Sequence, residues 1–296
     1  MRDWLQAVRV FSLTASVVPV LLGAVLAKTS QAGIAWWMLP LVLLAAMFFQ
    51  AGTNMVSDYY DYKKGVDTDY TFGGSKVIVQ RKLSAKSVLT AGLAMFAAGC
   101  AIGLVFVWFR GPVILAIGVI GFLGGLLYSA GPVGYKYLAL GDLAVFILMG
   151  PLMVIGSYFV LTGGYSHPVL LNSLPIGCLV TAILAANNLR DIKHDRQAGV
   201  RTFANTAGPQ AARIEYYLLI ALAYAVVVIN ILLDILTAWA LLVLVTLPIA
   251  VNNIRRIKTG DIEDPATLAD ADVISAKLHL AFGIVLIGSV ILGHLI

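Results

Sequence analysis

Two groups of acidic and amide side chains recur in the sequence at nearly the same spacing, and each ends in a glycine. The first acidic cluster consists of Asn54, Asp58, Asp61 and Gly65, and the second consists of Asn187, Asp191, Asp195 and Gly199. Residues three or four apart share one face of a helix, and oxygen ligands in that arrangement suit a hard divalent cation. Two such clusters facing each other predict a site for Mg²⁺ ions and, through them, a diphosphate.

The chain that positions these clusters is strongly apolar. It is 60% hydrophobic and 12% charged, with a mean hydropathy of +0.92. This composition excludes an ordinary soluble domain and is typical of a polytopic helical membrane protein. A bilayer crossing needs about 20 apolar residues, and nine such runs are predicted: 10–27, 35–56, 86–108, 112–129, 142–162, 168–189, 211–233, 235–252 and 274–296. We expect one all-α domain over 1–296, with nine transmembrane helices.

The basic residues predict the orientation of these helices. With the N-terminus inside, the N-terminal tail and the even-numbered loops hold 18 of the 20 Lys and Arg, and only Lys28 and Arg110 fall outside. Because Lys and Arg are enriched in cytoplasmic loops, we expect the N-terminus and both acidic clusters on the cytoplasmic side. The net charge of +5 is explained by this topology and by phosphate binding, without a nucleic acid partner.

The two clusters begin 133 residues apart, at 54 and 187, and each follows an even-numbered span. This offset of four helices indicates an internal repeat of two related bundles; a coincidence of two short acidic patterns is the alternative. The acids have a second interpretation as well, as a solvated rim paired with nearby basic residues. Those residues are Lys63, Lys64, Arg190, Lys193 and Arg196.

Several other charged residues lie near the predicted membrane edge. Lys136 is the sole cation of the fourth loop, and it either reflects topology or clamps a diphosphate. Lys76 ends a GGSK stretch whose backbone N–H groups and lysine could bind a phosphate. Asp142 either complements a helix dipole or orients an acceptor, and the sequence leaves both open. The remaining candidates are Arg9, Arg81 and Arg201, which together would surround a phosphate, and Asp67 and Asp69, one of which could join the metal site.

These motifs resemble those of the UbiA superfamily of intramembrane prenyltransferases. Within it, the chain is similar to the 1,4-dihydroxy-2-naphthoate polyprenyltransferases of menaquinone synthesis and to the related animal enzymes of vitamin K2 synthesis. The resemblance covers nearly the whole chain and is carried by RVFSLTASVVPVLLGAVLA, NMVSDYYDYKKGVDT, GGSKVIVQRKLS, GPVGYKYLALGDL and NNLRDIKHDRQAGVRTFA. The last of these stretches is the most specific to the naphthoate branch.

The resemblance implies nine helices around a central cavity, cytoplasmic cap loops, and Mg²⁺ as the cofactor. It implies that metal-assisted loss of diphosphate leaves an allylic carbocation, which an aromatic acceptor attacks. The implied metal ligands are Asn54, Asp58, Asp61, Asp191 and Asp195. Asp61 departs from the usual family spacing by one residue. The implied catalytic residues are Asp58, Asp191 and Lys136, and the substrate contacts are Arg9, Asn54, Lys76, Arg81, Tyr128, Lys136, Asn187 and Arg201.

The expected partners are a polyprenyl diphosphate, an aromatic acceptor and membrane lipid. The main alternative within the enzyme class is a sister prenyltransferase that uses 4-hydroxybenzoate, homogentisate or a glycerol phosphate lipid precursor. A transporter is the alternative outside the enzyme class. Its binding site is expected near the middle of the bilayer with interrupted helices, whereas the charges here lie at one face.

Overall fold

The computed structural model describes residues 1–30, 33–131 and 134–296, and these residues form helices and connecting loops. The one β-type pairing among them is an isolated parallel bridge between Leu138 and Arg201. The expected all-α class is therefore confirmed. In chain order the elements are α1 (Arg2–Val8), η1 (Val10–Leu13), α2 (Thr14–Ser30), η2 (Trp36–Met38), α3 (Leu39–Lys63), α4 (Ala85–Arg110), α5 (Pro112–Leu127), η3 (Tyr135–Tyr137), α6 (Gly141–Ile147), the π-helical turn η4 (Leu148–Leu152), α7 (Met153–Thr162), α8 (His167–Gln197), α9 (Phe203–Ala207), α10 (Pro209–Leu232), η5 (Ala238–Thr246), α11 (Leu247–Thr259), η6 (Pro265–Leu268) and α12 (Ala271–Leu295).

The apolar helices coincide with the predicted spans. Within the described ranges, eight helical segments are long and apolar enough to cross a membrane. The remaining predicted span, 112–129, corresponds to α5, which is apolar but only 16 residues long. A straight crossing needs about 20 residues, so α5 is the one predicted span that is shorter than expected.

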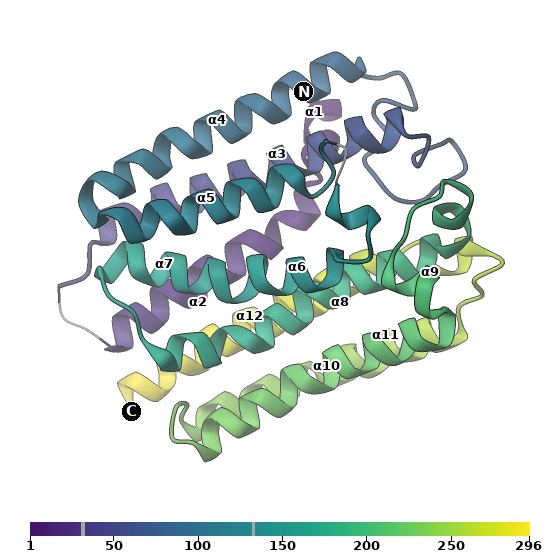
Figure 1. The fold of residues 1–296 in the computed structure, drawn as a ribbon. Helices are drawn as coiled ribbons and strands as arrows, with labels where there is room; N and C mark the ends of the chain where they lie inside the picture. Colours follow the sequence, from purple (N-terminus) through teal and green to yellow (C-terminus); the bar gives the residue numbers. More distant parts are fainter. Residues whose placement is uncertain (31–32, 132–133) are drawn as a thin grey trace.

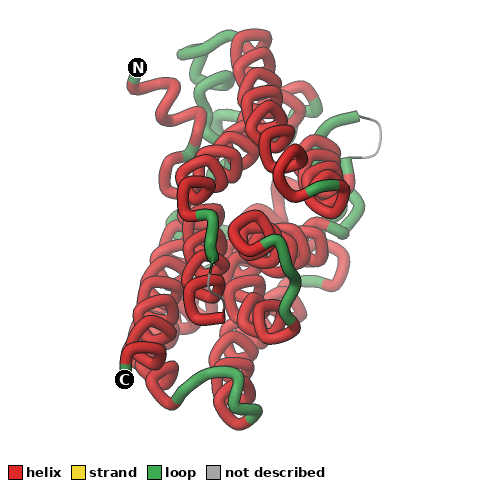
Figure 2. Tube along the Cα trace, turned by 90° about the vertical axis from the view of Figure 1, so that its left-hand side faces the viewer, coloured by secondary structure: helices red, strands yellow, loops and turns green. Residues whose placement is uncertain are grey.

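The helices form two groups that meet along α2. Helices α3, α4 and α5 pack together in the upper part of the molecule, and α8, α10 and α12 pack together in the lower part (Figure 1). Helix α2 contacts α3 on one side and α7 and α12 on the other. Figure 2 views the molecule from the end opposite the long polar loops, so that many of the helices are seen close to end-on.

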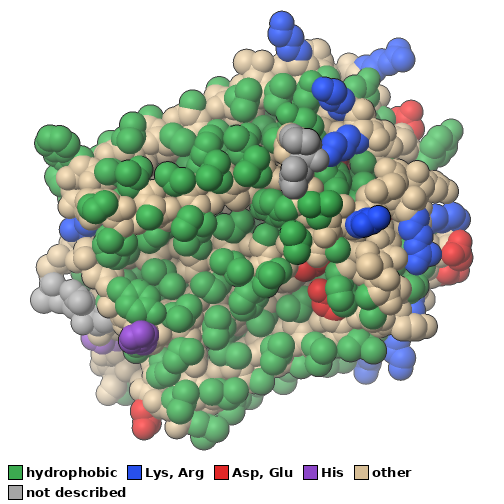
Figure 3. Space-filling view, viewed as in Figure 1, with side chains coloured by type: hydrophobic (Ala, Val, Ile, Leu, Met, Phe, Trp, Pro, Cys, Tyr) green, Lys and Arg blue, Asp and Glu red, His purple; other side chains and the backbone are tan. Residues whose placement is uncertain are grey.

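The surface is divided into an apolar band and a basic end. Hydrophobic side chains cover most of the face seen in Figure 3, and the Lys and Arg side chains on that face gather mainly at the end that carries the long loops. Large exposed side chains in the apolar band include Trp108 and Leu104. Because water would penalise such a surface, it indicates a protein embedded in lipid.

The acidic clusters lie at the ends of α3 and α8, and both helices end in the same way. The N–H groups of Gly65 and Val66 donate to the carbonyls of Tyr62 and Asp61, and the N–H group of Val200 donates to the carbonyl of Asp195 at 2.9 Å. The equivalent glycines, Gly65 and Gly199, take positive φ angles of 71° and 69°. Glycine adopts this left-handed backbone without steric cost.

Two helices continue beyond the predicted ends of their spans for the same physical reason. The second and sixth spans were expected to end at about 56 and 189, but α3 continues to Lys63 and α8 continues to Gln197. Hydropathy marks where the hydrocarbon ends, whereas each helix ends where its left-handed glycine reverses the backbone. Asp191 and Asp195 therefore lie on a rigid helix that projects beyond the apolar layer.

Candidate active site

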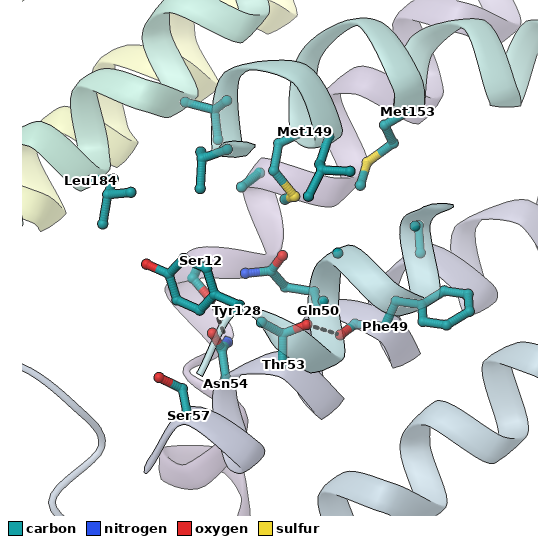
Figure 4. Close-up of a pocket in the computed structure, with 18 of the residues that line it drawn as sticks. Ser12, Phe49, Gln50, Thr53, Asn54, Ser57, Tyr128, Met149, Met153 and Leu184 are labelled. Atoms are coloured by element: carbon teal, nitrogen blue, oxygen red, sulfur yellow. Dashed lines mark hydrogen bonds between the residues drawn. The ribbon is translucent and has the colours of Figure 1, made fainter. Parts of the chain in front are cut away.

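Both acidic clusters open onto one cavity of about 590 Å³. Its walls are built from α2 to α8, with η1 and the loops at the basic end of the molecule. Figure 4 shows a polar wall with Asn54 and Ser57 of α3, an apolar wall with Met149 and Met153, and Tyr128 beside the polar wall. The cavity therefore combines a charged end with an apolar interior.

In the first acidic cluster, each carboxylate is held by a cation from a distant segment. The Arg9 guanidinium and the Ser75 hydroxyl both donate to Asp58, which is 3% exposed. Lys136 Nζ donates to Asp61 Oδ2 at 2.5 Å, and the Tyr137 hydroxyl donates to Asp61 Oδ1 at 2.8 Å. These contacts fix both carboxylates at the end of α3.

Asn54 has a different environment. Its amide nitrogen donates to the Val8 carbonyl and to the Ser12 hydroxyl, both at 2.9 Å. Asn54 lines the cavity, as does Ser12. Because the nitrogen is committed to α1 and η1, the amide oxygen is the part of Asn54 that remains for a ligand.

In the second acidic cluster, the carboxylates are arranged around one buried arginine. Arg190 donates to Asp191 Oδ1 and Oδ2 at 2.9 and 2.8 Å, and also to Asn187 Oδ1. Its other terminal nitrogen lies 3.2 Å from Asp272 of α12. Asp195 forms no ion pair or hydrogen bond with any other described side chain, although it is buried and lines the cavity.

A glycine-rich loop over 73–76 joins the two clusters. A Cβ atom placed on Gly73 would lie 3.0 Å from Asp191 Oδ2, so the bare backbone passes directly against the second cluster. The next residue but one, Ser75, binds Asp58 of the first cluster. The two clusters are therefore neighbours at one end of the molecule, as the sequence predicted.

Aromatic rings line the cavity beside Lys136. Lys136 Nζ lies 5.4 Å from the centre of the Tyr128 ring and 5.0 Å from that of Tyr137, within cation–π range. Tyr128 and Tyr135 meet edge to face, with centroids 5.5 Å apart. Lys136 thus links the charged end of the cavity to its aromatic wall.

The other predicted cations are placed differently. Arg9 lines the cavity, and its Nε has no hydrogen-bond partner in the described part of the chain. Lys76 instead binds the 67–71 segment, with Nζ 3.0 Å from the Thr68 carbonyl. Arg81 and Arg201 are exposed and do not line the cavity. Asp58 is also absent from the cavity wall, because Arg9 and Ser75 cover it.

Some contributors to the site were not identified from the sequence. Tyr137 and Ser75 hold carboxylates, although nothing in their types marks them as partners. Arg190 was interpreted only as a possible rim charge, yet it is 0% exposed. Its position between Asn187 and Asp191 on the same helix was the available signal.

Asp67 adds a third acidic element at the mouth of the cavity. It lines the cavity and pairs weakly with Lys76, at 3.5 Å. Burial raises the pKa of Asp67 to about 6, with Asp61 acting in the same direction and Lys76 opposing it. An acid in this environment favours a nearby cation.

The donor set suits Mg²⁺ bound together with a substrate. In the described ranges, no three His, Cys, Asp or Glu side chains converge closely enough to enclose a metal ion. Mg²⁺, however, usually takes one or two carboxylates and completes its shell with water and substrate phosphates. Asp61, Asp191 and Asp195 supply such oxygens around one cavity. A ligand carrying phosphate groups could bind metal ions held by Asp61 on one side and by Asp191 and Asp195 on the other, and so bridge the two clusters.

The fold and the site define a helical membrane protein with an acidic, glycine-bridged pocket above an apolar cavity. The UbiA prenyltransferase family matches residues 16–288. The chain belongs to this family, and it is a prenyltransferase.

Named relatives agree with this class. The chain is 32% identical over 258 residues to a 1,4-dihydroxy-2-naphthoate octaprenyltransferase of Mycobacterium tuberculosis, a match that covers 87% of each chain. It is also 32% identical over 286 residues to the protein of the same name in Bacillus subtilis, covering 95% of this chain and 89% of that one.

A solved structure has the same fold. The UbiA homologue of Archaeoglobus fulgidus, bound to GPP and Mg²⁺, superposes with a TM-score of 0.65. The two chains share 17% identity, and the match covers 97% of this chain and 99% of the other. The predicted resemblance to UbiA prenyltransferases is thereby confirmed.

Proposed function

We propose that this protein transfers a polyprenyl group from an allylic diphosphate to 1,4-dihydroxy-2-naphthoate, with Mg²⁺ as cofactor. The observation that carries the proposal is the meeting of two acidic clusters at one cavity whose interior is apolar. The acidic end suits a metal-bound diphosphate, and the apolar interior suits an isoprenoid chain. The names of the two bacterial relatives support the choice of acceptor.

The proposed donor site lies between α3 and α8. Asn54, Asp58 and Asp61 on one side and Asp191 and Asp195 on the other would hold Mg²⁺ through their oxygens. Bound Mg²⁺ would neutralise the diphosphate and stabilise the negative charge that develops as it leaves. Asn187 and the backbone of the 73–76 loop lie beside this position.

The cations of the chain would contact the same diphosphate. Arg9 and Lys136 line the cavity and now pair with Asp58 and Asp61. If those carboxylates held Mg²⁺, Arg9 and Lys136 would be free to donate to phosphate oxygens. Fixed donors aimed at a leaving group lower the barrier to its departure. Lys76, Arg81 and Arg201 would need to move to join them.

The apolar part of the cavity would receive the allylic cation. The Tyr128 ring lines it close to Lys136, and an aromatic face stabilises a neighbouring positive charge. The low water content of such a cavity protects the cation until a ring carbon of the acceptor attacks.

The basic end of the molecule is proposed to face the cytoplasm. The acidic clusters and most of the basic surface in Figure 3 lie at that end. Lys and Arg gather on the cytoplasmic side of membrane proteins. A carboxylate-bearing acceptor such as the naphthoate would then approach the active site from the cytoplasmic side.

The decisive experiment uses purified protein in lipid vesicles with geranyl diphosphate and Mg²⁺. Separate reactions would contain 1,4-dihydroxy-2-naphthoate or 4-hydroxybenzoate, and mass analysis of the lipid extract would identify the product. We expect prenylated naphthol only from the first acceptor, with activity lost in EDTA and restored by Mg²⁺. If only 4-hydroxybenzoate gave a product, the assignment of the naphthoate as acceptor would be refuted. If activity survived EDTA, the assignment of Mg²⁺ as cofactor would be refuted.

A further inference from the structure

Among the described acidic groups that line the cavity outside the proposed donor site, Asp142 is the one fixed by an amide side chain. Asp142, in the first turn of α6, is 7% exposed and lines the cavity. Its two carboxylate oxygens accept from the amide nitrogen of Asn188 of α8, at 3.1 and 3.3 Å. Asn188 lines the cavity as well. The carboxylate is therefore fixed in orientation by a neutral partner.

This neutral partner distinguishes Asp142 from three of the cluster acids, which pair with cations, and from Asp195, which has no side-chain partner among the described residues. Asp58, Asp61 and Asp191 each pair with an arginine or a lysine, whereas no Lys, Arg or His among the described residues pairs with Asp142. A buried carboxylate is costly without compensation. A carboxylate offers about four acceptor positions, and the single Asn188 nitrogen leaves some of them for a ligand.

Asp142 also lies at a suitable place along the cavity. Tyr128, the ring proposed to face the allylic cation, lines the same cavity as Asp61 and Asp142. Leu184, one turn before Asn188 on α8, lies near Gly141, since a Cβ there would be 3.5 Å from its side chain. In Figure 4, Tyr128 and Leu184 lie on opposite walls of the cavity. A flat ring bound between Tyr128 and Leu184 would lie beside the start of α6, where Asp142 lines the cavity.

We propose that Asp142 binds a ring hydroxyl of the aromatic acceptor and takes its proton during transfer. This inference rests on the proposed function. As the bond from the prenyl carbon to diphosphate breaks, the ring carbon that bears the carboxylate forms the new carbon–carbon bond, and the proton of the neighbouring hydroxyl passes to the Asp142 carboxylate. This leaves a ring ketone whose carboxylate is lost as CO₂, which returns the electron pair to the ring. The ring oxygen then takes the proton back from Asp142, which restores both the hydroxyl and the carboxylate.

Asn188 is then a positioning residue, because it acts on the acceptor only through Asp142. Glu215 of α10 provides a matched control. It lies on a helix that packs against α8, and it does not line the cavity. If proximity of an acid were sufficient, the two carboxylates would have similar effects on catalysis.

The test compares Asp142→Asn, Asn188→Ser and Glu215→Gln in the vesicle assay. Loss of a general base lowers rates by about 10²–10⁴-fold, so we expect Asp142→Asn to lower kcat at least about 100-fold and to raise the KM of the naphthol. Asn188→Ser should lower kcat about tenfold, because misplacing a catalytic group by a fraction of an ångström is sufficient for that. Glu215→Gln should stay within about twofold of wild type.

Two further measurements separate a catalytic role from a structural one. Binding of a non-hydrolysable allylic thiolodiphosphate with Mg²⁺, followed by calorimetry, should be unchanged in Asp142→Asn. A naphthol analogue with a more acidic hydroxyl should lose less rate in that variant, since it needs the base less. Loss of donor binding together with rate would contradict the proposal, and so would wild-type kcat and KM in Asp142→Asn.

If Asp142→Asn does not fold, Asn188→Ser decides the question, because it leaves the carboxylate in place. An unchanged kcat in Asn188→Ser would then overturn the inference. Failure of the wild-type protein to prenylate any aromatic acceptor would instead refute the proposed function. The wild-type reaction therefore distinguishes the two failures.

Discussion

The two acidic clusters share a backbone and differ in what surrounds it. Asp61 and Asp195 each accept, through the main-chain carbonyl, the N–H of a valine that follows a left-handed glycine. In the first cluster, however, the carboxylates are held by Arg9, Lys136 and Tyr137, from segments far away in sequence. In the second cluster, the partner of Asp191 is Arg190 of the same helix, and Asp195 has no side-chain partner among the described residues.

This difference shows two ways to prepare acidic groups for a cation. The first cluster is completed only when α1, the 73–76 loop and η3 have docked around the end of α3. The second cluster is organised by Arg190 within α8 and is then anchored to α12 through Asp272. The geometry of the first cluster should therefore depend on the docking of α1, the 73–76 loop and η3, and that of the second cluster on the buried charge of Arg190.

The largest effect is expected from removing one charge in each cluster. Asp58→Asn and Asp191→Asn should each lower kcat by about 10³-fold or more, because both clusters are proposed to neutralise one diphosphate. The double variant should be little worse than either single one, since groups that act as a unit are not additive. Steady-state transfer assays would measure this.

Asp69→Asn is the control for these variants, because Asp69 is exposed on the loop that follows α3. It should keep near-normal turnover. If either Asp58→Asn or Asp191→Asn does the same, the cluster concerned does not hold the metal, and the comparison between two equivalent clusters fails.

The next largest effect is expected at Lys136. Lys136→Gln removes a donor to Asp61 and Ser57 and, in the proposed complex, a donor to the diphosphate. Loss of one such donor typically lowers kcat by about 10²–10³-fold. Lys64 is the matched control, since its side chain is exposed although its Nζ lies 3.6 Å from the centre of the Tyr137 ring. Equal kinetic effects of Lys64→Gln and Lys136→Gln would contradict a specific role for Lys136.

The free energy of unfolding should show how far the second cluster depends on Arg190. Arg190→Gln leaves Asp191 and Asp272 without their buried partner, and breaking such a pair typically costs about 3–5 kcal/mol of unfolding free energy. Arg196→Gln, at an exposed position on the same helix, should change it by less than about 0.5 kcal/mol. Denaturant unfolding in detergent would measure both. Similar values for the two variants would show that Arg190 does not organise the second cluster.

The smallest expected effect concerns Asp67 in chelator-treated protein. Its ordinary pKa is 3.8 and burial raises it to about 6, so the folded protein binds more protons than the unfolded chain between these values. Stability should therefore decrease as pH rises from about 4 to about 6. Asp67→Asn should remove part of that slope and raise stability at pH 7 by on the order of 1 kcal/mol. An unchanged pH dependence of the thermal midpoint would contradict the assigned pKa.

The sequence predicted those parts of the molecule that follow from local chemistry. Long apolar runs must be helical in lipid, because every backbone group needs an internal partner there, and this located each span. The spacing of Asn54, Asp58 and Asp61 and that of the second cluster predicted their meeting at one end. The equivalent glycines also have a local cause, since Gly65 and Gly199 both end a helix.

The sequence could not predict how distant side chains would pair. Arg9 reaches Asp58 because α1 folds back across α3, and nothing in either segment states this. Arg81 and Arg201 were grouped with Arg9 by charge alone, yet their side chains are exposed. Ser75 and Tyr137 hold carboxylates only because their loops cross the ends of α3. These are tertiary contacts, which residue spacing does not encode.

The left-handed glycines at the two helix ends also constrain evolution of the chain by insertion. Each glycine sits four residues after the last aspartate of its cluster, at 61 and 65 and at 195 and 199. One added residue inside that interval would turn the aspartate by about 100° around the helix axis relative to the reversal, away from the opposite cluster. Changes in length should therefore be tolerated better at the exposed part of the loop around Tyr70 than between Asp61 and Gly65.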